Sequence, residues 1–400
     1  MQAGKVAIVF NRIGPYHYAR LRAAARVCDL IAIQGILQDE TYAWNTVEFD
    51  GKIPVQTLFS ERETENQTLR ELARRFTQTM RQIRPEVLLV PGWSSPLALI
   101  SLNWCCRNRI PAVLMSESTA WDKKRGAAKE WIKQRVVALF STALAGGTPQ
   151  LDYLKKLGMP TERVFLGYDA VDNDYFRSAC DKVRTRGTEV RQQFRLPPKY
   201  FLASARFVEK KNLPRLLEAY THYRKQNPKS LWHLVLLGDG PLKKKLESLV
   251  NELGLHDCVH FPGFKQYSVL PAYYGLAGAF VHASTTEQWG LVVNEAMASG
   301  LPILVSARCG CALDLVRNGI NGFTFDPFSV DHLAACLANV ARLDEQGRLR
   351  MGAESQRLIA PWGLERFADG FGRAAHLAAS TPTLRSGFLS RLLLAALLLK

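Results

Sequence analysis

Two glutamates in the segment Thr286–Pro302 are the side chains whose type and spacing most strongly indicate chemistry. Glu287 precedes Gly290, and Glu295 lies in the apolar stretch that follows this glycine. A glycine here allows a close backbone approach, and the apolar stretch predicts a helix. Taken alone, two such glutamates are more often a helix-start carboxylate and a solvated helix residue. A functional role for them is therefore inferred from the whole segment and not from the pair.

The start of this helix is a candidate anion site. The backbone N–H groups from Leu291 and Val292 onward have no partner within the helix, and the helix dipole favours negative charge there. Eight residues of helix span about 12 Å. Two carboxylates at that separation can bracket a diphosphate, with Glu287 on a sugar and Glu295 on a ribose.

Basic side chains follow an earlier expected strand, Tyr200–Ala203, and precede an expected helix, Leu213–Gln226. Arg206 offers a planar fork and Lys211 a point charge, a suitable pair for a leaving diphosphate. Lys210 is the member of the lysine pair that we expect to face solvent. The competing interpretation is that these are ordinary solvated loop residues.

Two glycine-containing turns come after the next expected strands. The first, Gly238–Pro241, lacks the third glycine of a dinucleotide fingerprint, so a plain turn is its simpler interpretation. The second, Phe261–Phe264, ends a strand and could offer backbone groups to a base. We count Gly238 and Phe264 among the candidate donor-binding residues.

In this order and spacing, residues 200–345 resemble the nucleotide-sugar domain of the family-4 retaining glycosyltransferases (group 1) of the GT-B fold. The motifs that carry the resemblance are Arg206 to Lys211, Gly238–Pro241, Phe261–Phe264, the Glu287/Glu295 pair, Gly300–Pro302 and Asn321–Phe323.

The resemblance implies that Glu287 contacts the donor sugar, Glu295 the nucleotide ribose, and Arg206 and Lys211 the diphosphate. Two positions depart from the family pattern. Ala205 stands where the family has a glycine before the arginine, and Asp314 where it has a glutamate. Neither removes a phosphate or ribose ligand, so we expect an active enzyme.

The N-terminal half matches less well, as expected of an acceptor-binding domain. Gly14, after the first expected strand, falls where the family brings a glycine loop against donor and acceptor. Tyr16 and His17 open the following helix and are acceptor-side candidates, although a lone histidine is more often structural.

Glu117 follows the expected strand Ala112–Met115 at the end that should face the cleft, and it is our candidate acceptor base or orienting residue. The family pattern differs here, since many relatives carry a histidine near this position. Arg125, with Asp122 and two lysines beside it, would meet a phosphate-bearing acceptor or simply start a helix.

Asp172 and Asp174 have the D-x-D spacing of metal-dependent transferases. They lie in a segment that we interpret as a connection between domains, and Arg206, Lys211 and a helix terminus already meet the diphosphate charge. We therefore expect no metal ion and no cofactor besides the nucleotide-sugar substrate.

Strand-like and helical stretches alternate along the 400 residues, which is typical of an α/β fold with parallel sheets. We expect two Rossmann-like, doubly wound domains facing a central cleft: residues 1–180 for the acceptor and residues 200–360 for the nucleotide sugar, joined by 181–199. Residues 361–400 are expected to form a helix that packs back toward the first domain, followed by a leucine-rich tail.

The net charge of +16 indicates a polyanionic partner, and the basic excess is larger in the first 200 residues. An anionic membrane surface fits this charge and the terminal leucines, while nucleic acid is not expected because no aromatic platform is interleaved with the basic residues. The eight cysteines are not spaced as a disulfide framework. Reduced thiols, no signal segment and no membrane span fit a cytoplasmic protein, peripheral on the inner face of the cell membrane.

The sequence thus predicts a retaining transfer of a sugar from a nucleotide diphosphate to a hydroxyl of a glycan or lipid-linked acceptor, in cell-surface polysaccharide or glycolipid synthesis. Two alternatives stay open: a sugar-nucleotide epimerase of the same architecture, which needs no acceptor, and a non-enzymatic basic module that binds polyanions.

Overall fold

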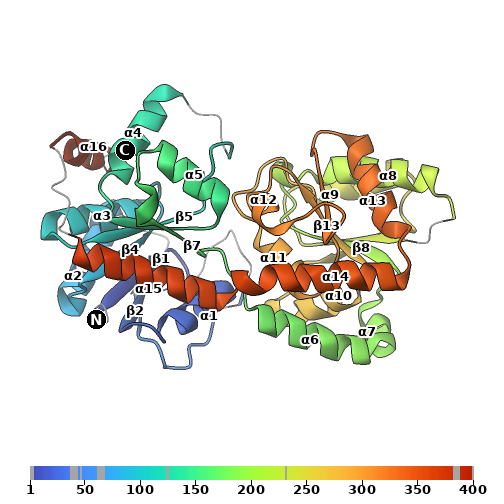
Figure 1. The fold of residues 1–400 in the computed structure, drawn as a ribbon, viewed down its shortest axis with the longest axis horizontal. Coiled ribbons are helices and arrows are strands. Elements are labelled where there is room, and N and C mark those ends of the chain that lie inside the picture. The colour runs from blue at the N-terminus through green and yellow to red at the C-terminus, as the bar shows by residue number, and fades with distance from the viewer. Residues whose placement is uncertain are drawn as a thin grey trace. The chain divides into compact units, whose positions relative to one another are not determined.

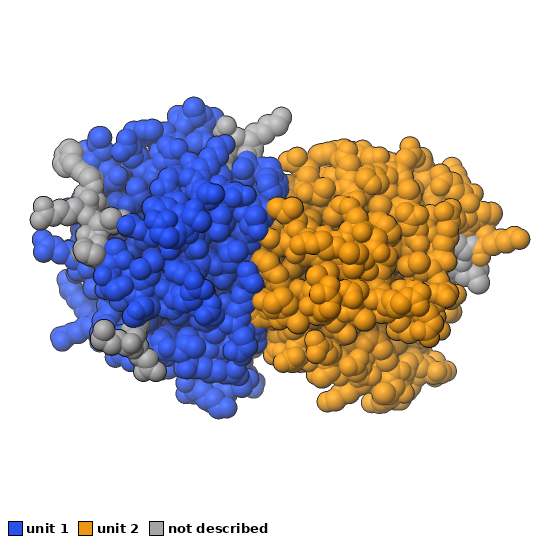
Figure 2. All heavy atoms as spheres, viewed as in Figure 1, with its two compact units in different colours: residues 1–170, 364–400 blue, residues 171–363 orange. Residues whose placement is uncertain are grey.

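The computed structural model describes residues 4–36, 44–45, 47–60, 68–122, 126–229, 232–381 and 388–398. The chain divides into two compact units. Unit 1 comprises residues 1–170 and 364–400, and unit 2 comprises residues 171–363 (Figure 2).

Unit 1 contains a seven-stranded sheet in the order β3-β2-β1-β4-β5-β6-β7, and all neighbouring strands in it are parallel (Figure 1). Its strands are β1 (Val6–Phe10), β2 (Leu30–Ile36), β3 (Val55–Phe59), β4 (Val87–Pro91), β5 (Ala112–Ser116), β6 (Thr142–Ala145) and β7 (Val164–Leu166). Its helices are α1 (Pro15–Ala24), α2 (Leu69–Ile83), α3 (Pro96–Asn108), α4 (Ala127–Val137), α5 (Thr148–Lys156), α15 (Leu364–Ser380) and α16 (Phe388–Leu398).

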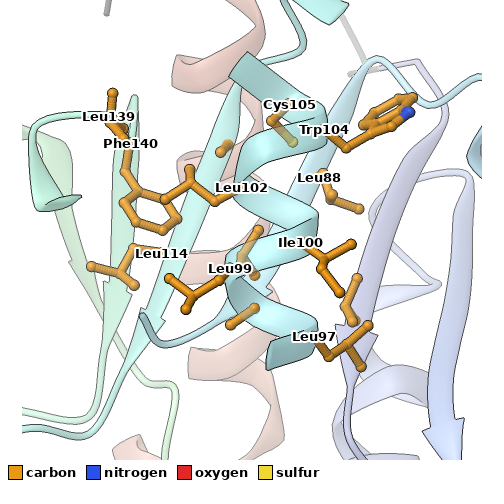
Figure 3. Close-up of a cluster of buried hydrophobic side chains, with 14 of the residues drawn as sticks. Leu88, Leu97, Leu99, Ile100, Leu102, Trp104, Cys105, Leu114, Leu139 and Phe140 are labelled. Carbon is orange, nitrogen blue, oxygen red and sulfur yellow. The ribbon is translucent and has the colours of Figure 1, made fainter. Parts of the chain in front are cut away.

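Helices cover both faces of this sheet, so its central strands are mostly apolar, whereas the edge strand β3 carries the exposed Gln56 and Thr57. Ala7 and Val9 of β1 face the core under α2 and α3, whereas Val6 and Ile8 face the core under α1 and α15. Figure 3 shows the first of these cores around α3. The alternation along one strand is the reason that a single apolar run serves two cores.

Unit 2 contains a six-stranded parallel sheet in the order β10-β9-β8-β11-β12-β13. Its strands are β8 (Tyr200–Ser204), β9 (His233–Leu237), β10 (Val259–Gly263), β11 (Ala279–His282), β12 (Ile303–Ser306) and β13 (Gly322–Phe325). Its helices are α6 (Asn173–Thr185), α7 (Gly187–Phe194), α8 (Leu213–Gln226), α9 (Lys243–Glu252), α10 (Leu270–Leu276), α11 (Leu291–Ala298), α12 (Ala312–Leu315), α13 (Val330–Ala341) and α14 (Glu345–Ile359).

Each unit is therefore a doubly wound α/β domain, as the alternating pattern predicts. The stretch 181–199, which we expect to connect the domains, instead contains the end of α6 and all of α7, and both helices belong to unit 2. The division falls after Ala170. The stretch is poor in aliphatic residues because α7, which forms much of it, buries only Val190 among its side chains.

The C-terminal segment returns to the first unit. Helix α15 packs against α1 and against β6 and β7, and α16 packs against α3 and α4. The chain changes unit after Gly363 rather than after residue 360. None of the helices in the described ranges is long and apolar enough to cross a membrane.

All eight cysteines are free thiols, as expected. Cys309 and Cys311 come closest to each other, with their sulfur atoms 3.5 Å apart.

The D-x-D pair has a local structural role. The side chain of Asp172 accepts a hydrogen bond from the backbone N–H of Tyr175 at 2.9 Å and caps α6, while Asp174 is exposed in the first turn. An N-terminal cap of this kind satisfies a helix N–H that would otherwise lack a partner.

We expect Asp172→Ala to lower the free energy of unfolding by about 1 kcal/mol, because the cap is lost, and Asp172→Asn to restore most of it. Urea denaturation of both variants measures this, with Asp174→Ala as the matched control. An equal loss from Asp174→Ala would contradict the capping role.

Candidate functional site

The candidate residues of unit 2 gather at one edge of its sheet. Arg206 follows β8, Gly238 follows β9, Phe264 follows β10 and Glu287 follows β11, so all four lie beyond the carboxyl ends of parallel strands. Ligands of open α/β sheets bind at this edge, where loops are free of the packed layers.

The glycine turn after β9 holds the loop that carries Arg206. Ala205 N–H donates to Leu237 O, and Phe207 N–H donates to Asp239 O at 2.8 Å. Gly238 has a φ of 137°, and a Cβ there would lie 1.9 Å from Ala205 O. The turn thus needs glycine for close packing against the loop, and Arg206 is left exposed at its tip.

Lys211 is brought to the site by Asn212, a buried residue with a φ of 58°. The Asn212 side-chain amide donates to Ala283 O at 3.0 Å and to Pro327 O at 2.8 Å. In addition, Thr285 N–H donates to Lys210 O at 2.9 Å. These bonds tie the loop after β8 to the loop after β11.

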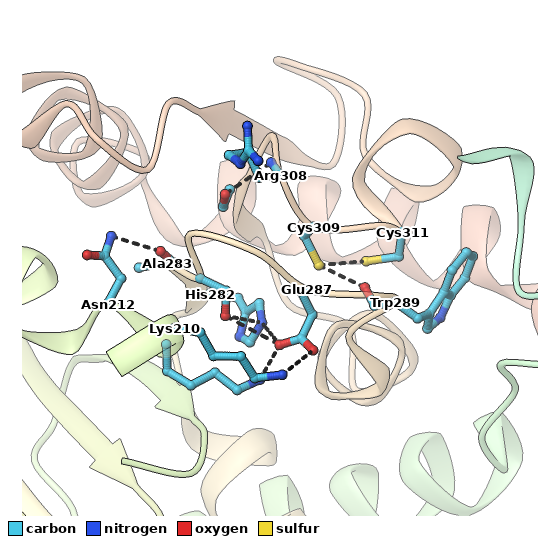
Figure 4. Close-up of polar contacts among 12 residues, drawn as sticks. Lys210, Asn212, His282, Ala283, Glu287, Trp289, Arg308, Cys309 and Cys311 are labelled. Carbon is cyan, nitrogen blue, oxygen red and sulfur yellow. Dashed lines mark hydrogen bonds and ion pairs between the residues drawn. The ribbon is translucent and has the colours of Figure 1, made fainter. Parts of the chain in front are cut away.

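The carboxylate of Glu287 is the centre of a compact polar cluster (Figure 4). Its Oε2 forms an ion pair with Lys211 Nζ and lies 3.3 Å from His282 Nε2. Ser284 Oγ donates to the same oxygen at 3.4 Å and lies 3.1 Å from His282 Nε2. Oε1 faces Lys210 Nζ at 3.7 Å. One oxygen is therefore held by three side chains, whereas the other faces a half-exposed lysine.

The electrostatics of the cluster keep Glu287 ionised. Burial acts to raise its pKa, but the hydrogen bond with His282 and the charge of Lys211 outweigh burial and hold the pKa well below its usual value. Burial also lowers the pKa of His282, which favours the neutral imidazole.

The backbone beside Glu287 is shaped for a close approach. Gly290 has a φ of 106°, and a Cβ there would lie 2.8 Å from the sulfur of Cys309. Helix α11 begins directly after it, so Leu291 and Val292 occupy the first turn as expected. The N–H of the next residue, Val293, is already bonded to Gly290 O at 2.8 Å.

Glu295 lies in α11 and is 1% exposed. Its negative charge helps to raise the pKa values of Tyr274 and Tyr267, after the larger effect of burial on both phenols. Two tyrosines thus surround this carboxylate. Tyr267 in turn stacks on Tyr175 with 4.8 Å between ring centres. Glu295 is therefore not the solvated helix residue of the simpler interpretation.

The sequence pattern predicts that Glu287, Lys211 and Gly290 lie at one site, but it does not single out His282 and Ser284. His282 is the last residue of β11, and the strand-end rule that singled out Arg206 could have found it. Its burial at 3% exposure could not be read from the sequence.

In unit 1, Gly14 and His17 lie just beyond the carboxyl end of β1. Gly14 N–H donates to His17 Nδ1 at 3.2 Å, and the His17 ring packs on Phe10 at 4.5 Å. Burial, together with the nearby charges of Arg20 and Arg12, lowers the pKa of His17 to about 3. The neutral ring thus caps the start of α1, which gives His17 a structural role.

The other acceptor-side candidates are more scattered. Tyr16 packs edge-to-face on Trp44, with 6.0 Å between ring centres. Glu117 follows β5, is partly buried, and its charge helps to raise the pKa of Tyr168, after burial. Arg125 lies outside the described residues. Within the described ranges, no group of three or more His, Cys, Asp or Glu side chains is placed to hold a metal ion.

Comparison with known proteins agrees with this geometry. Residues 187–357 match the family model described as "Glycosyl transferases group 1". The match covers the sheet edge that carries Arg206, Lys211, Glu287 and Glu295, and it confirms the resemblance stated above to group 1 glycosyltransferases.

Two solved structures show that the fold is that of the GT-B glycosyltransferases. Anabaena Alr3699/HepE, in complex with UDP and glucose, has a TM-score of 0.70 at 19% identity, over 92% of this chain and 98% of its own. Sucrose-phosphate synthase from Thermosynechococcus elongatus has a TM-score of 0.71 at 18% identity, over 92% of this chain and 97% of its own.

Curated relatives match over shorter stretches. Mannosylfructose-phosphate synthase of Agrobacterium fabrum is 28% identical over 245 residues, which is 58% of this chain and 53% of the relative. Alpha-monoglucosyldiacylglycerol synthase of Acholeplasma laidlawii is 35% identical over 123 residues, 30% of each chain. The chain thus spans about half or less of the length of these two relatives.

We expect Gly238→Ala to lower the free energy of unfolding by more than about 3 kcal/mol, because the new Cβ meets a backbone oxygen and the φ is strained. Gly319→Ala is the control, since its φ is also positive but nothing lies within 4 Å. We expect it to lose only about 1 kcal/mol by urea denaturation. Equal losses would show that φ alone, and not the contact with Ala205, requires glycine at 238.

The lowered pKa of Glu287 predicts a pH dependence of stability. The unfolded chain takes up a proton near the usual value of 4.5, whereas the folded site does not. The contribution of Glu287 is therefore fully present above this pH and is lost below it, at up to about 1.4 kcal/mol per pH unit. Chemical denaturation between neutral pH and pH values below 4.5 should show a shallower decline for Glu287→Gln. The exposed Glu218→Gln on α8 is the control, and a Glu287→Gln profile parallel to it would refute the prediction.

Proposed function

We propose that the protein is a retaining, family-4 glycosyltransferase, which moves a sugar from a nucleotide-diphosphate sugar to a hydroxyl group of a glycan or lipid-linked acceptor. The observation that carries this proposal is the Glu287–Lys211 ion pair beside Gly290 and α11, within the residues that match the family model. Relatives named as sugar-phosphate and glycolipid synthases support the same class of reaction.

In this proposal the diphosphate of the donor binds Arg206, Lys211 and the first turn of α11. Lys211 then exchanges its partner Glu287 for the phosphate oxygens, and the charge that develops on the leaving group is stabilised at the site. Glu287 Oε1, the oxygen that faces only Lys210 in the cluster, would accept from a hydroxyl of the donor sugar.

Glu295 would accept hydrogen bonds from the ribose hydroxyls, and Gly238 and Phe264 would contact the nucleoside. We assign acceptor binding to unit 1, with Gly14, Tyr16, His17 and Glu117 as candidates. The reaction as proposed requires no metal ion or cofactor, and we place it in the cytoplasm, with the protein peripheral on the inner face of the membrane.

Purified protein incubated with labelled nucleotide sugars tests the class of reaction. We expect transfer only when a glycan or glycolipid acceptor is added, with the anomeric configuration of the donor kept in the product, as read by NMR. Consumption of the nucleotide sugar without any acceptor would indicate the epimerase instead. Failure to bind any nucleoside diphosphate in a thermal-shift panel would contradict both enzymes.

Two substitutions test the assignment of residues. Glu295→Gln removes a charged acceptor and should weaken nucleoside-diphosphate binding about tenfold, since a hydrogen bond to a charged group contributes about 1.5 kcal/mol. Arg206→Ala should lower kcat about a hundredfold with a smaller change in KM. Arg350→Gln, an exposed position on α14, is the control. Unchanged binding and kinetics in both variants would refute the site.

A further inference from the structure

A second concave site lies in unit 1, apart from all candidate residues named above. It is a cavity of about 570 Å³ between α2, α3 and the last turn of α16. Three arginines line it: Arg70 and Arg81 from α2, and Arg107 from α3. All three are exposed, and no acidic side chain lines the cavity among the residues that the structure describes.

Other arginines on α2 are neutralised, which makes these three distinct. Glu71 binds Arg74 at 2.7 Å and Arg75 at 2.8 Å. For Arg70, Arg81 and Arg107, by contrast, the described part of the chain provides no ion pair. Arginines that line one cavity and have no carboxylate partner among the described residues can bind an anion, and the planar fork of a guanidinium group fits phosphate oxygens.

Apolar side chains also line the cavity. Trp104, Leu398 and Leu69 are among them, and Leu69 is 44% exposed. Trp104 is only 9% exposed and meets Phe76 edge-on, so it offers no open ring on which a nucleic-acid base could stack.

Helix α16 extends this apolar surface. Leu394 is 1% exposed and packs into the core with α3 and α4, whereas Leu389 and Leu392 are 56% and 50% exposed. One side of the helix is thus held by the domain, and the other presents leucines to the surroundings. Basic side chains beside exposed leucines are typical of helices that lie in the membrane interface.

We propose that this arginine pocket binds the phosphate headgroup of an anionic phospholipid, while Leu389 and Leu392 of α16 enter the interfacial layer. A soluble phosphorylated molecule would satisfy the arginines but not the leucines, so we assign the pocket to a lipid surface. The inference rests on the membrane association proposed above, which it locates, but it does not depend on the sugar-transfer reaction.

Vesicle flotation of the full chain, without any nucleotide, tests this inference. We expect binding to phosphatidylglycerol vesicles and not to phosphatidylcholine vesicles, with release at high salt. A triple variant, Arg70→Gln with Arg81→Gln and Arg107→Gln, should bind about a hundredfold more weakly, if each arginine contributes about fivefold.

The matched control removes the same charge elsewhere. Lys225→Gln, Lys244→Gln and Arg350→Gln lie at exposed positions of unit 2, and this triple variant should retain binding. A second variant, Leu389→Ser with Leu392→Ser, should lose at least tenfold in affinity for the same vesicles, because exposed leucines can no longer be buried in lipid. Both altered surfaces are exposed, and circular dichroism checks that each variant folds.

Three results would overturn the proposal: no flotation of the unsubstituted protein, equal losses in the two triple variants, or full retention in the arginine variant. Titration with inorganic phosphate addresses the soluble source of the same chemistry. Tight phosphate binding at the arginines without vesicle binding would also count against a lipid site. Nucleoside-diphosphate binding by the same samples reports separately on the proposed function.

Discussion

The Glu287 carboxylate is the group on which the candidate site of unit 2 depends, because a buried charge must be compensated. Lys211, His282 and Ser284 provide this compensation on one oxygen. To reach Glu287, Lys211 requires the left-handed backbone of Asn212, whose amide ties together three loops. The loops at this sheet edge are thus arranged around one ion pair, which a diphosphate would compete for.

Close backbone packing at two glycines also shapes the loops at this edge of the unit 2 sheet. Gly238 lies against Ala205 O and Gly290 against Cys309, and in both places a methyl group would collide. These glycines hold two loops that would otherwise be pushed apart, the one that exposes Arg206 and the one that begins α11. The same feature that permits a ligand to approach the backbone is therefore also a requirement of the fold.

The two units differ in how their charged side chains are arranged. In unit 2, Glu287 and Lys211 pair with each other, so the candidate site contains both negative and positive side chains. In unit 1, Arg70, Arg81 and Arg107 line a cavity together with Leu398 of α16, and the described part of its lining holds no carboxylate. The net charge of +16 is thus in part a local property of one helix layer, and a lipid phosphate would neutralise it there.

The sequence predicted the two parallel sheets, and it predicted that Arg206, Gly238 and Glu287 follow strands of one of them, because strand alternation and glycine turns are local signals. It did not indicate α7 within the expected connection at 181–199, since this helix buries only Val190 among its side chains. The three-dimensional structure was needed to show that Lys211 forms an ion pair with Glu287 and that Leu398 of α16 lines the arginine pocket. Both contacts involve residues far apart in the chain, and packing across a sheet or between helices is not encoded in any short stretch of residues.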